Sequence, residues 1–350
     1  MALTAISEFG PNQWVGLILS KSGAEPTLIL ALTAGFRYTD EEKTASWDNI
    51  RHQAVIAGFT NATTPFKIAR DPFIATVPFG SHKDGLTEAV PYANISYQWN
   101  EDLMTYFTYS EGFKGGGVQV RNGPQPAVPL FGPEFVKSYE VGLKWSGWEG
   151  RINLSAAGFF MDYTDLQIAA TVATVRADGT VATNSRVTNA GDAEMSGFEL
   201  EMQMQPTDNL RLDFGVSYLD AKYTDLIPGP VSVDDALPFA PEWQLNGSAA
   251  YNIPTTYGTF TPRVDVGYMG EAFNEYSNST LTQRVAYTRL NFSLGFVDSS
   301  EKWSGAFFVH NALDKQVIIN GFDGIPFGSG YSDGAISRPI EWGIRVRRSF

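Results

Sequence analysis

The sequence of 350 residues contains no cysteine and no long apolar run, and these two absences exclude whole classes of protein. Without cysteine the chain has no disulfide framework, no thiol nucleophile and no thiolate metal site. Its longest apolar stretch, residues 14–19, is far shorter than the roughly 18 residues that a spanning helix needs. A mean hydropathy of −0.15 agrees, so a helical membrane protein is excluded.

Positive charge and histidine are also scarce. Lys and Arg total 25 against 38 Asp and Glu, and the resulting net charge of −13 excludes a nucleic-acid partner, because phosphate binding needs clustered basic residues. The three histidines are scattered without ligand spacing, so we expect no metal, cofactor or catalytic residue. Residues 1–10 have neither the basic start nor the apolar run of a secretory signal.

Strict alternation of apolar and polar residues recurs along the chain. The clearest case is the last segment, where Trp342, Ile344 and Val346 alternate with charged residues or glycine. The same pattern covers residues 139–145, 198–204, 210–216 and 290–296. Successive strand side chains point to opposite faces, so each segment has one apolar and one polar face. Carboxylates and guanidinium groups on the polar face indicate that it meets water.

About twelve segments have the length of a membrane-crossing strand. They lie near residues 29–39, 89–99, 103–113, 135–145, 148–163, 195–205, 210–222, 243–253, 259–271, 285–297, 303–312 and 336–350. Short turns at 100–102, 146–147, 206–209, 254–258 and 298–302 alternate with long loops at 40–88, 115–134, 167–194, 223–242, 272–284 and 314–335. This alternation predicts an all-β, antiparallel transmembrane β-barrel with two unlike ends.

Aromatic residues near the strand ends suit the two surfaces of a membrane, where amphipathic rings sit at headgroup level. We expect such girdles from Trp99, Tyr106, Tyr109, Trp145, Trp148, Tyr163, Trp243, Tyr251, Trp303 and Trp342. In bacterial outer-membrane barrels the short turns face the periplasm and the long loops face outside. The C-terminal Phe350 is therefore expected in the periplasm.

Several ordered motifs carry a resemblance to a known family. They are residues 32–43 (LTAGFRYTDEEK), 102–116, 133–134 with 137–144 (KSYEVGLK), 157–163, 189–191 (NAG) leading to 197–201 (GFELE), 218–223 (YLDAKY), 238–241 and 311–315 (NALDK). From Leu30 to Phe350 the chain resembles the C-terminal part of the barrel of a TonB-dependent outer-membrane receptor, of the siderophore-receptor type.

The resemblance implies a fold and a set of partners. Family barrels have about 22 strands around a plug, and about twelve are expected here, with signal, TonB-binding segment and plug absent. Residues 1–28 are expected to be a poorly matching remnant and 29–350 the barrel part, in a truncated or fragmentary product whose Met1 lies inside an outside loop. The implied partners are outer-membrane lipid, the TonB energy-coupling complex through the missing N-terminal region, and a ferric siderophore or similar ligand.

Three groups of candidate functional residues follow. Expected lumen residues, facing the plug or the solute path, are Arg37, Glu140, Lys144, Glu199, Glu201, Arg211, Asp213, Arg263, Asp265, Arg345 and Arg347. Expected ligand contacts in outside loops are Trp47, Arg51, Phe113, Lys114 and Arg121, because loops on a rigid scaffold carry recognition. The expected barrel-assembly signal is Trp342, Ile344, Val346 and Phe350, with Arg348 as the one break in its apolar face.

Two other readings of the same pattern stay open at this point. A self-contained barrel of about twelve strands would act as a channel or an autotransporter-like translocator, since such a barrel can close around a narrow lumen. A soluble β protein that binds glycans would place the charged face in water and the apolar face in a packed core. A half-barrel left open would expose strand edges that are prone to aggregation.

Overall fold

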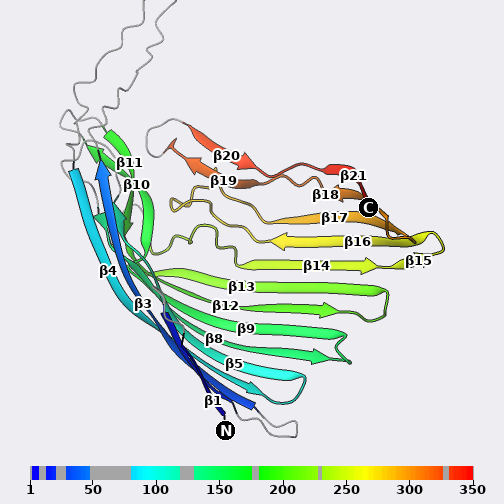
Figure 1. Ribbon diagram of the computed structural model, residues 1–350. Helices are drawn as coiled ribbons and strands as arrows, with labels where there is room; N and C mark the ends of the chain where they lie inside the picture. Colours follow the sequence, from blue (N-terminus) through cyan, green and yellow to red (C-terminus); the bar gives the residue numbers. More distant parts are fainter. Residues whose placement is uncertain are drawn as a thin grey trace, which may run out of the picture.

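A single antiparallel sheet dominates the computed structural model, which describes residues 2–7, 13–20, 29–47, 80–118, 130–175, 181–227, 231–325 and 331–349. The sheet has 15 strands and curves into an open trough (Figure 1). Its strands are β1 (Ala2–Ser7), β2 (Gln13–Ser20), β3 (Ile29–Trp47), β4 (Gly80–Gln98), β5 (Leu103–Lys114), β8 (Glu134–Gly147), β9 (Ile152–Thr164), β12 (Gly191–Met204), β13 (Leu210–Leu226), β14 (Trp243–Tyr251), β15 (Ile253–Thr255), β16 (Gly258–Met269), β17 (Tyr287–Asp298), β18 (Trp303–His310) and β21 (Glu341–Arg348).

Each strand pairs with its neighbour in the sequence, as the alternation of connections predicts. The path runs β1-β2-β3-β4-β5-β8-β9-β12-β13-β14-β16-β17-β18-β21, and β15 pairs with β16. All twelve expected strands are present in it. Tight connections lie at one end, which we call the short-turn end, and longer ones at the other, the long-loop end (Figure 1). The long connections contain the hairpins β6 (Gly117–Val118) with β7 (Leu130–Phe131), β10 (Gln167–Val175) with β11 (Val181–Asn189), and β19 (Ile318–Asp323) with β20 (Ser332–Ile336).

The first hairpin is much longer than the sequence predicts. Strands β3 and β4 pair from Ile29 opposite Gln98 to Trp47 opposite Gly80, so parts of the expected loop 40–88 are strand. Polar contacts hold this extension, including Thr87 Oγ1 donating to Asp40 Oδ1 at 3.2 Å. Both faces meet water there, and the sequence therefore loses the apolar alternation that marks the rest of the strand.

The turn between β8 and β9 also differs from the prediction. The expected strand began at Trp148, but β8 continues to Gly147 and residues 148–151 form the turn. Trp148, Glu149 and Gly150 have positive φ angles of 52°, 56° and 81°. Three consecutive left-handed residues cannot belong to a strand, so these residues form the turn that reverses the chain. Tryptophan and glutamate do not indicate this conformation in the sequence.

Two strands precede the part of the chain where alternation is readable. Strand β2 pairs with β3, with Leu19 opposite Leu32, and β1 pairs with β2. The domain boundary at residue 28 stays a prediction. At the opposite edge β21 pairs with β18. Among the described strands β1 and β21 do not pair with each other, so the sheet is open rather than a closed barrel of about twelve strands.

The sheet is one layer, and its apolar face is exposed instead of packed in a core. Large apolar side chains on this outer face include Phe36, Phe107, Val141, Phe292 and Phe307, each 44 to 60% exposed. An apolar surface of this extent fits a lipid environment. A small packed cluster lies instead at the long-loop end, where Ile168, Ala193, Tyr223, Val231 and Leu237 are buried together.

Candidate functional site

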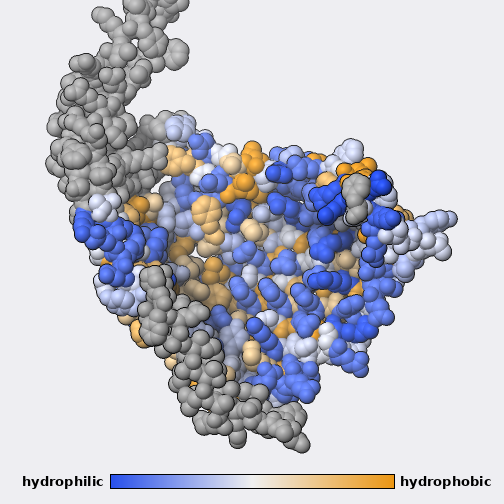
Figure 2. Space-filling view, in the orientation of Figure 1, coloured by the Kyte–Doolittle hydropathy of each residue, from blue (hydrophilic) through white to orange (hydrophobic). Residues whose placement is uncertain are grey.

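The concave inner face carries all eleven residues that the sequence assigns to the lumen. Cross-strand registers link them: Glu140 lies opposite Phe159, Lys144 opposite Ser155, and Glu201 opposite Ser155 from the other side. The registers of the other strands, with side chains alternating between the two faces, place the remaining eight residues on the same face: Arg37, Glu199, Arg211, Asp213, Arg263, Asp265, Arg345 and Arg347. Hydrophilic residues cover most of the surface formed by β12 to β18 in Figure 2. Their role in contacting a plug or a solute stays a prediction.

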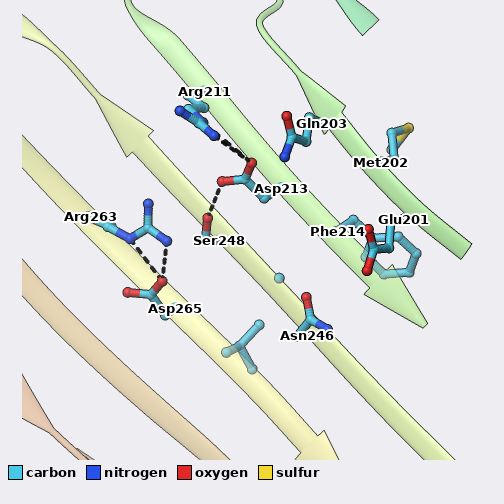
Figure 3. A pocket seen from close by; sticks show the side chains of 12 residues that line it. Glu201, Met202, Gln203, Arg211, Asp213, Phe214, Asn246, Ser248, Arg263 and Asp265 are labelled. Carbon is cyan, nitrogen blue, oxygen red and sulfur yellow. Dashed lines mark hydrogen bonds and ion pairs between the residues drawn. The ribbon is translucent and has the colours of Figure 1, made fainter. Parts of the chain in front are cut away.

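Two acid–base pairs stand next to each other on this face. Arg263 Nη2 and Nε both donate to Asp265 Oδ1, at 2.6 and 2.9 Å. Arg211 Nη2 donates to Asp213 Oδ1 at a longer 3.4 Å, and Ser248 Oγ donates to Asp213 Oδ2 at 2.8 Å (Figure 3). Each pair joins residues two apart on one strand, so period two alone places both partners on the same face.

Register turns these pairs into two rows of opposite charge. Asp213 and Asp265 flank Ser248 in one row, and Arg211 and Arg263 flank Ala250 in the row nearer the short-turn end. A hollow of about 540 Å³ opens over them, lined by these residues with Gln203 and Asn246 (Figure 3). The side chains are partly exposed, between 27 and 62%, so the groups stay hydrated and available to a polar partner.

A second polar contact joins the lumen candidate Glu140 to Tyr106, whose inward position the sequence reasoning missed. Tyr106 faces inward, where its hydroxyl donates to Glu140 Oε1 at 2.7 Å. Its ring covers Gly142, since a Cβ there would lie 2.5 Å from the ring. The expected place of Tyr106 in the outer aromatic girdle is therefore wrong, and so is that of Tyr163, which packs against the buried cluster. Glu140 lies opposite Thr108, and Tyr106 is two residues before Thr108 on the same strand. The alternation of side chains therefore assigns Tyr106 to the inner face.

The arginines of the last strand lack such partners in their own strand. Arg345 lies opposite Ala306 and Arg347 opposite Ser304, so the residue directly across from each is small. The Arg345 guanidinium lies 6.0 Å from the Phe308 ring, which in turn covers Gly343. The opposite face of β21 carries Trp342, Ile344 and Val346, which are 71, 73 and 67% exposed. Their role in assembly stays a prediction, and Phe350 lies outside the described residues.

Arg348 breaks the apolar face of the last strand without being isolated there. It lies opposite Trp303, and its guanidinium sits 5.2 Å from the Trp303 ring centre. A cation over an aromatic face is stabilised by the ring quadrupole, and a long basic side chain near a strand end can reach toward water. The contact with the Trp303 ring therefore compensates for placing the charged Arg348 on the apolar face.

The candidate loop residues are less completely placed. Arg51 and Arg121 lie outside the described residues, and Trp47 is the last residue of β3. Phe113 and Lys114 belong to strand β5, opposite Phe135 and Glu134, and not to a loop as expected. They are in a strand because β8 begins at Glu134, opposite Lys114, and pairs with β5 up to its last residue.

One loop candidate and one lumen candidate come together. Strand β5 pairs with β4 only up to Ser110, and near its end two side chains of β3 reach it. The Phe113 ring is 6.0 Å from the Arg37 guanidinium, and Lys43 Nζ donates to the Gly116 carbonyl at 3.1 Å. The long β3–β4 hairpin thus supports the exit of β5, a contact between segments about 70 residues apart.

Two polar side chains organise the long-loop end. Asn189 Nδ2 donates to the carbonyls of Gly132, Pro133 and Asp165, at 3.0, 3.0 and 2.8 Å. Gln167 Nε2 donates to Gly132 O at 3.0 Å and reaches the carbonyls of Lys114 and Gly115 at 3.3 and 3.2 Å. These amides tie together the ends of β5, β9 and β11, which explains the Asn189-Ala190-Gly191 motif.

A separate cluster of polar side chains joins the β16–β17 connection to the β19–β20 hairpin at this end. Asp323, 4% exposed, accepts hydrogen bonds from Ser279 Oγ at 2.7 Å, Ile325 N at 3.0 Å and Ser332 Oγ at 3.2 Å. Glu275 Oε1 accepts from Asp323 N and from Thr282 Oγ1. The Ser279 hydroxyl, aided by Ile325 N and Ser332, holds the pKa of Asp323 below its usual range. The β19–β20 hairpin is thereby fixed to the β16–β17 connection.

Neither a metal centre nor a spanning helix emerges in the part of the chain that the structure describes. No three His, Cys, Asp or Glu side chains gather there as metal ligands would. Within the same residues no helix is long and apolar enough to cross a membrane. The inner wall, where the paired charges line the hollow, is the candidate functional surface.

Known proteins share both the sequence pattern and the fold. The profile of the family described as TonB dependent receptor-like, beta-barrel, matches residues 27–312. The pesticin receptor of Yersinia pestis is 23% identical over 250 residues, 70% of this chain and 34% of that protein. The metal-pseudopaline receptor CntO of Pseudomonas aeruginosa is 27% identical over 251 residues, 68% of this chain and 31% of that protein. The chain thus spans about a third of these relatives.

Solved structures extend the likeness over almost the whole chain. The ferric yersiniabactin uptake receptor FyuA of Yersinia pestis has a TM-score of 0.72 at 18% identity, covering 97% of this chain and 47% of its own. The siderophore receptor PiuA of Acinetobacter baumannii has a TM-score of 0.65 at 14% identity, covering 96% and 42%. The chain belongs to the TonB-dependent receptor-like β-barrel family, whose members are transporters of the Gram-negative outer membrane and not enzymes.

Proposed function

We propose that this chain forms part of the barrel wall of a receptor that takes up a metal chelate across the outer membrane, with energy supplied through TonB. A ferric siderophore is the chelate that we favour. Membership of the family over residues 27–312 carries the proposal. The four proteins named above are a pesticin receptor, a metal-pseudopaline receptor, a ferric yersiniabactin uptake receptor and a siderophore receptor. Three of these four names refer to a metal complex or a siderophore.

The inner wall suits this function by its chemistry. Two of its guanidinium groups, those of Arg211 and Arg263, are paired with Asp213 and Asp265, so they offer charge to a polar partner without a large cost of reordering. A plug or a passing chelate that carries carboxylate or hydroxamate oxygens would exchange hydrogen bonds with Arg263 or Arg211. In this arrangement the short-turn end and the C-terminus face the periplasm, and the long-loop end faces outside.

Uptake of iron in the host strain tests the proposal. Cells grown without iron would be given ⁵⁵Fe bound to the siderophores of their own spent medium, with and without a proton uncoupler. Deleting the gene that encodes this chain should remove the uncoupler-sensitive uptake. Unchanged uptake in the deletion strain would overturn the proposal, and uptake that persists with the uncoupler would indicate a passive channel.

Two matched double variants connect uptake to the inner wall. Arg263→Gln with Asp265→Asn removes an inner pair, and we expect slower uptake at equal receptor abundance. Lys83→Gln with Glu42→Gln removes an outer ion pair of 2.5 Å on the β3–β4 hairpin and should leave uptake unchanged. Equal effects of the two variants would show that the inner pair has no special part in transport.

A further inference from the structure

A second, smaller hollow opens on the inner face beside the one described above. Its volume is about 170 Å³, and it borders two short turns, residues 148–151 and 205–209. Arg151 and Arg211 line it, together with the amide side chains of Asn153, Gln203 and Gln205. Among the described residues no carboxylate lines this hollow, whereas three line the larger one. We call it the short-turn hollow.

Strand register explains why the two arginines meet here. Gln203 on β12 lies opposite Asn153 on β9 and opposite Asp213 on β13. Arg151 and Arg211 each come two residues before one of these partners, so the alternation of side chains assigns both to the inner face, on either side of β12. Two strand spacings separate them, or about 10 Å. One small ligand between these two long side chains can therefore contact both guanidinium groups.

Each arginine is held by a carboxylate that does not line the short-turn hollow. Arg151 Nη2 donates to Asp208 Oδ1 at 2.7 Å, and Asp208 is 86% exposed. Arg211 contacts Asp213 only at 3.4 Å. A guanidinium carries five N–H groups, so these contacts orient the arginines and leave donors over. In the part of the chain that the structure describes, neither Arg211 Nη1 nor the side-chain amide of Gln203 makes a hydrogen bond.

This set of donors fits carboxylate groups on a small ligand. A guanidinium binds a carboxylate through two parallel N–H···O bonds, and amide N–H groups can donate to the remaining oxygens. An anionic ligand in the larger hollow meets the carboxylates of Glu201, Asp213 and Asp265, and none of these lines the smaller one. Like charges repel, so the short-turn hollow is the better place for a solute with two or more carboxylates.

The two hollows adjoin through shared residues. Arg211 and Gln203, which Figure 3 shows on neighbouring strands, line both of them. A carboxylate held between Arg263 and Arg211 can move to the pair Arg211 and Arg151 without losing its contact with Arg211. The looser ion pair of Arg211, 3.4 Å against 2.6 Å for Arg263, leaves this side chain free to follow the ligand.

We propose that Arg151 and Arg211 form an exit site for a chelate that carries carboxylate groups, occupied after the larger hollow and before release at the short-turn end. The exit role rests on the proposed uptake function, because it requires a solute that passes along this wall. The site itself can be tested without transport, since a free polycarboxylate should bind there in the purified protein. A failed binding test would therefore leave the uptake function standing.

Binding of tricarballylate, a small tricarboxylate, tests the site. The protein would be purified from outer membranes in mild detergent, and the dissociation constant measured by ligand-observed NMR. Arg151→Gln with Arg211→Gln should weaken binding about 25-fold, from about fivefold for each partly exposed arginine. Lys302→Gln removes a positive charge from another short turn and should leave the dissociation constant unchanged. Equal binding by the folded double Gln variant and the unaltered protein would overturn the proposal.

A titration of the unaltered protein decides the case if the double Gln variant does not fold. Tricarballylate should bind more tightly than its uncharged trimethyl ester, and more tightly than inorganic phosphate. If the ester binds equally well, charge has no part and the site is refuted. Equal binding of phosphate would refute the preference for carboxylates.

Uptake in the host strain separates the exit role from the site. The double Gln variant should slow ⁵⁵Fe uptake at equal receptor abundance, and Lys302→Gln should not. Unchanged uptake in a variant that has lost tricarballylate binding would overturn the exit role alone. Uptake that persists when the gene is deleted would instead overturn the proposed function and the exit role with it, and the binding measurements would still decide the site.

Discussion

Asn189 and Gly132, which are 57 residues apart, bind each other through two reciprocal hydrogen bonds. Gly132 N donates to Asn189 Oδ1 at 2.6 Å, and Asn189 Nδ2 donates to the Gly132 carbonyl at 3.0 Å. One side-chain amide thus reproduces the donor and acceptor of a paired backbone residue. It satisfies backbone groups where β9 and β11 end and where β8 is about to begin.

Replacing Asn189 by Ala should therefore loosen the long-loop end. The change removes four hydrogen bonds and leaves partly buried backbone groups without partners, at a cost of about 1–3 kcal/mol. Urea unfolding in detergent and limited proteolysis of the long connections would measure it. Asn153→Ala, which loses a single exposed contact of 3.4 Å to Gly150, is the control. Equal protease resistance of both variants would contradict this role for Asn189.

Gly191→Ala should be more damaging than an ordinary glycine replacement in the sheet. Gly191 has φ of 155°, and a Cβ there would lie 2.0 Å from the Asp225 carbonyl oxygen on β13. Backbone on both sides would have to shift, which we expect to cost on the order of 1–3 kcal/mol. Gly267→Ala provides the comparison, since its nearest neighbour is 4.0 Å away. The Gly191→Ala variant should have the lower unfolding midpoint of the two. Equal midpoints would show that the backbone of β13 can shift to accommodate the added methyl group.

Tyr106 should stabilise the inner wall through both its hydroxyl and its ring. Tyr106→Phe removes the 2.7 Å hydrogen bond to Glu140 and should cost about 1 kcal/mol. Tyr106→Ala also uncovers Gly142 and should cost more, about 3 kcal/mol or above. Comparing Tyr106→Phe in the presence and absence of Glu140→Ala, which has no acceptor, isolates the hydrogen bond. If the Phe and Ala variants unfold at the same urea concentration, the ring contributes nothing.

Acid should release the β19–β20 hairpin from the β16–β17 connection. Hydrogen bonds, first that of the Ser279 hydroxyl, lower the pKa of Asp323 in the folded protein. Asp323 therefore stabilises the fold fully above the unfolded pKa of about 3.9, and this stabilisation is lost as pH falls through the lower folded pKa. Hydrogen exchange in residues 318–323 should rise at acidic pH.

The variant Asp323→Asn separates this effect from general acid sensitivity. It should exchange faster than the unaltered protein at neutral pH and lose the extra acid-induced increase. The exposed Asp333 on the facing strand β20 offers a control, and Asp333→Asn should keep the normal profile. A pH profile of Asp323→Asn that matches the unaltered protein would show that another group controls the hairpin.

Alternation in the sequence was sufficient to assign side chains to the two faces. Within each strand the apolar residues mark the outer face, so period two places Glu201, Asp213 and Asp265 inside without any tertiary information. The family motifs then gave the barrel itself. Tyr106 was misplaced because it was judged by its closeness to a strand end, while its parity places it inside.

The long-loop end could not be derived in the same way. Strands β3 and β4 extend beyond the apolar layer, where both faces are polar and alternation no longer distinguishes strand from loop. In the turn at 148–151, residues 148–150 adopt left-handed conformations, which tryptophan and glutamate rarely do. Of the three residues with positive φ in this turn, only Gly150 is a type that commonly adopts that conformation.

The sequence by itself determined the all-β class, the order of strands, the two faces and the two unlike ends, because each depends on local spacing between neighbours along the chain. Only the tertiary structure decided which distant groups meet. Three features depend on register between strands: the support of β5 by β3, the Asn189 bonds to Gly132, and the charge rows across β13, β14 and β16. Register is set by the curvature and pairing of the whole sheet, so no single segment encodes it.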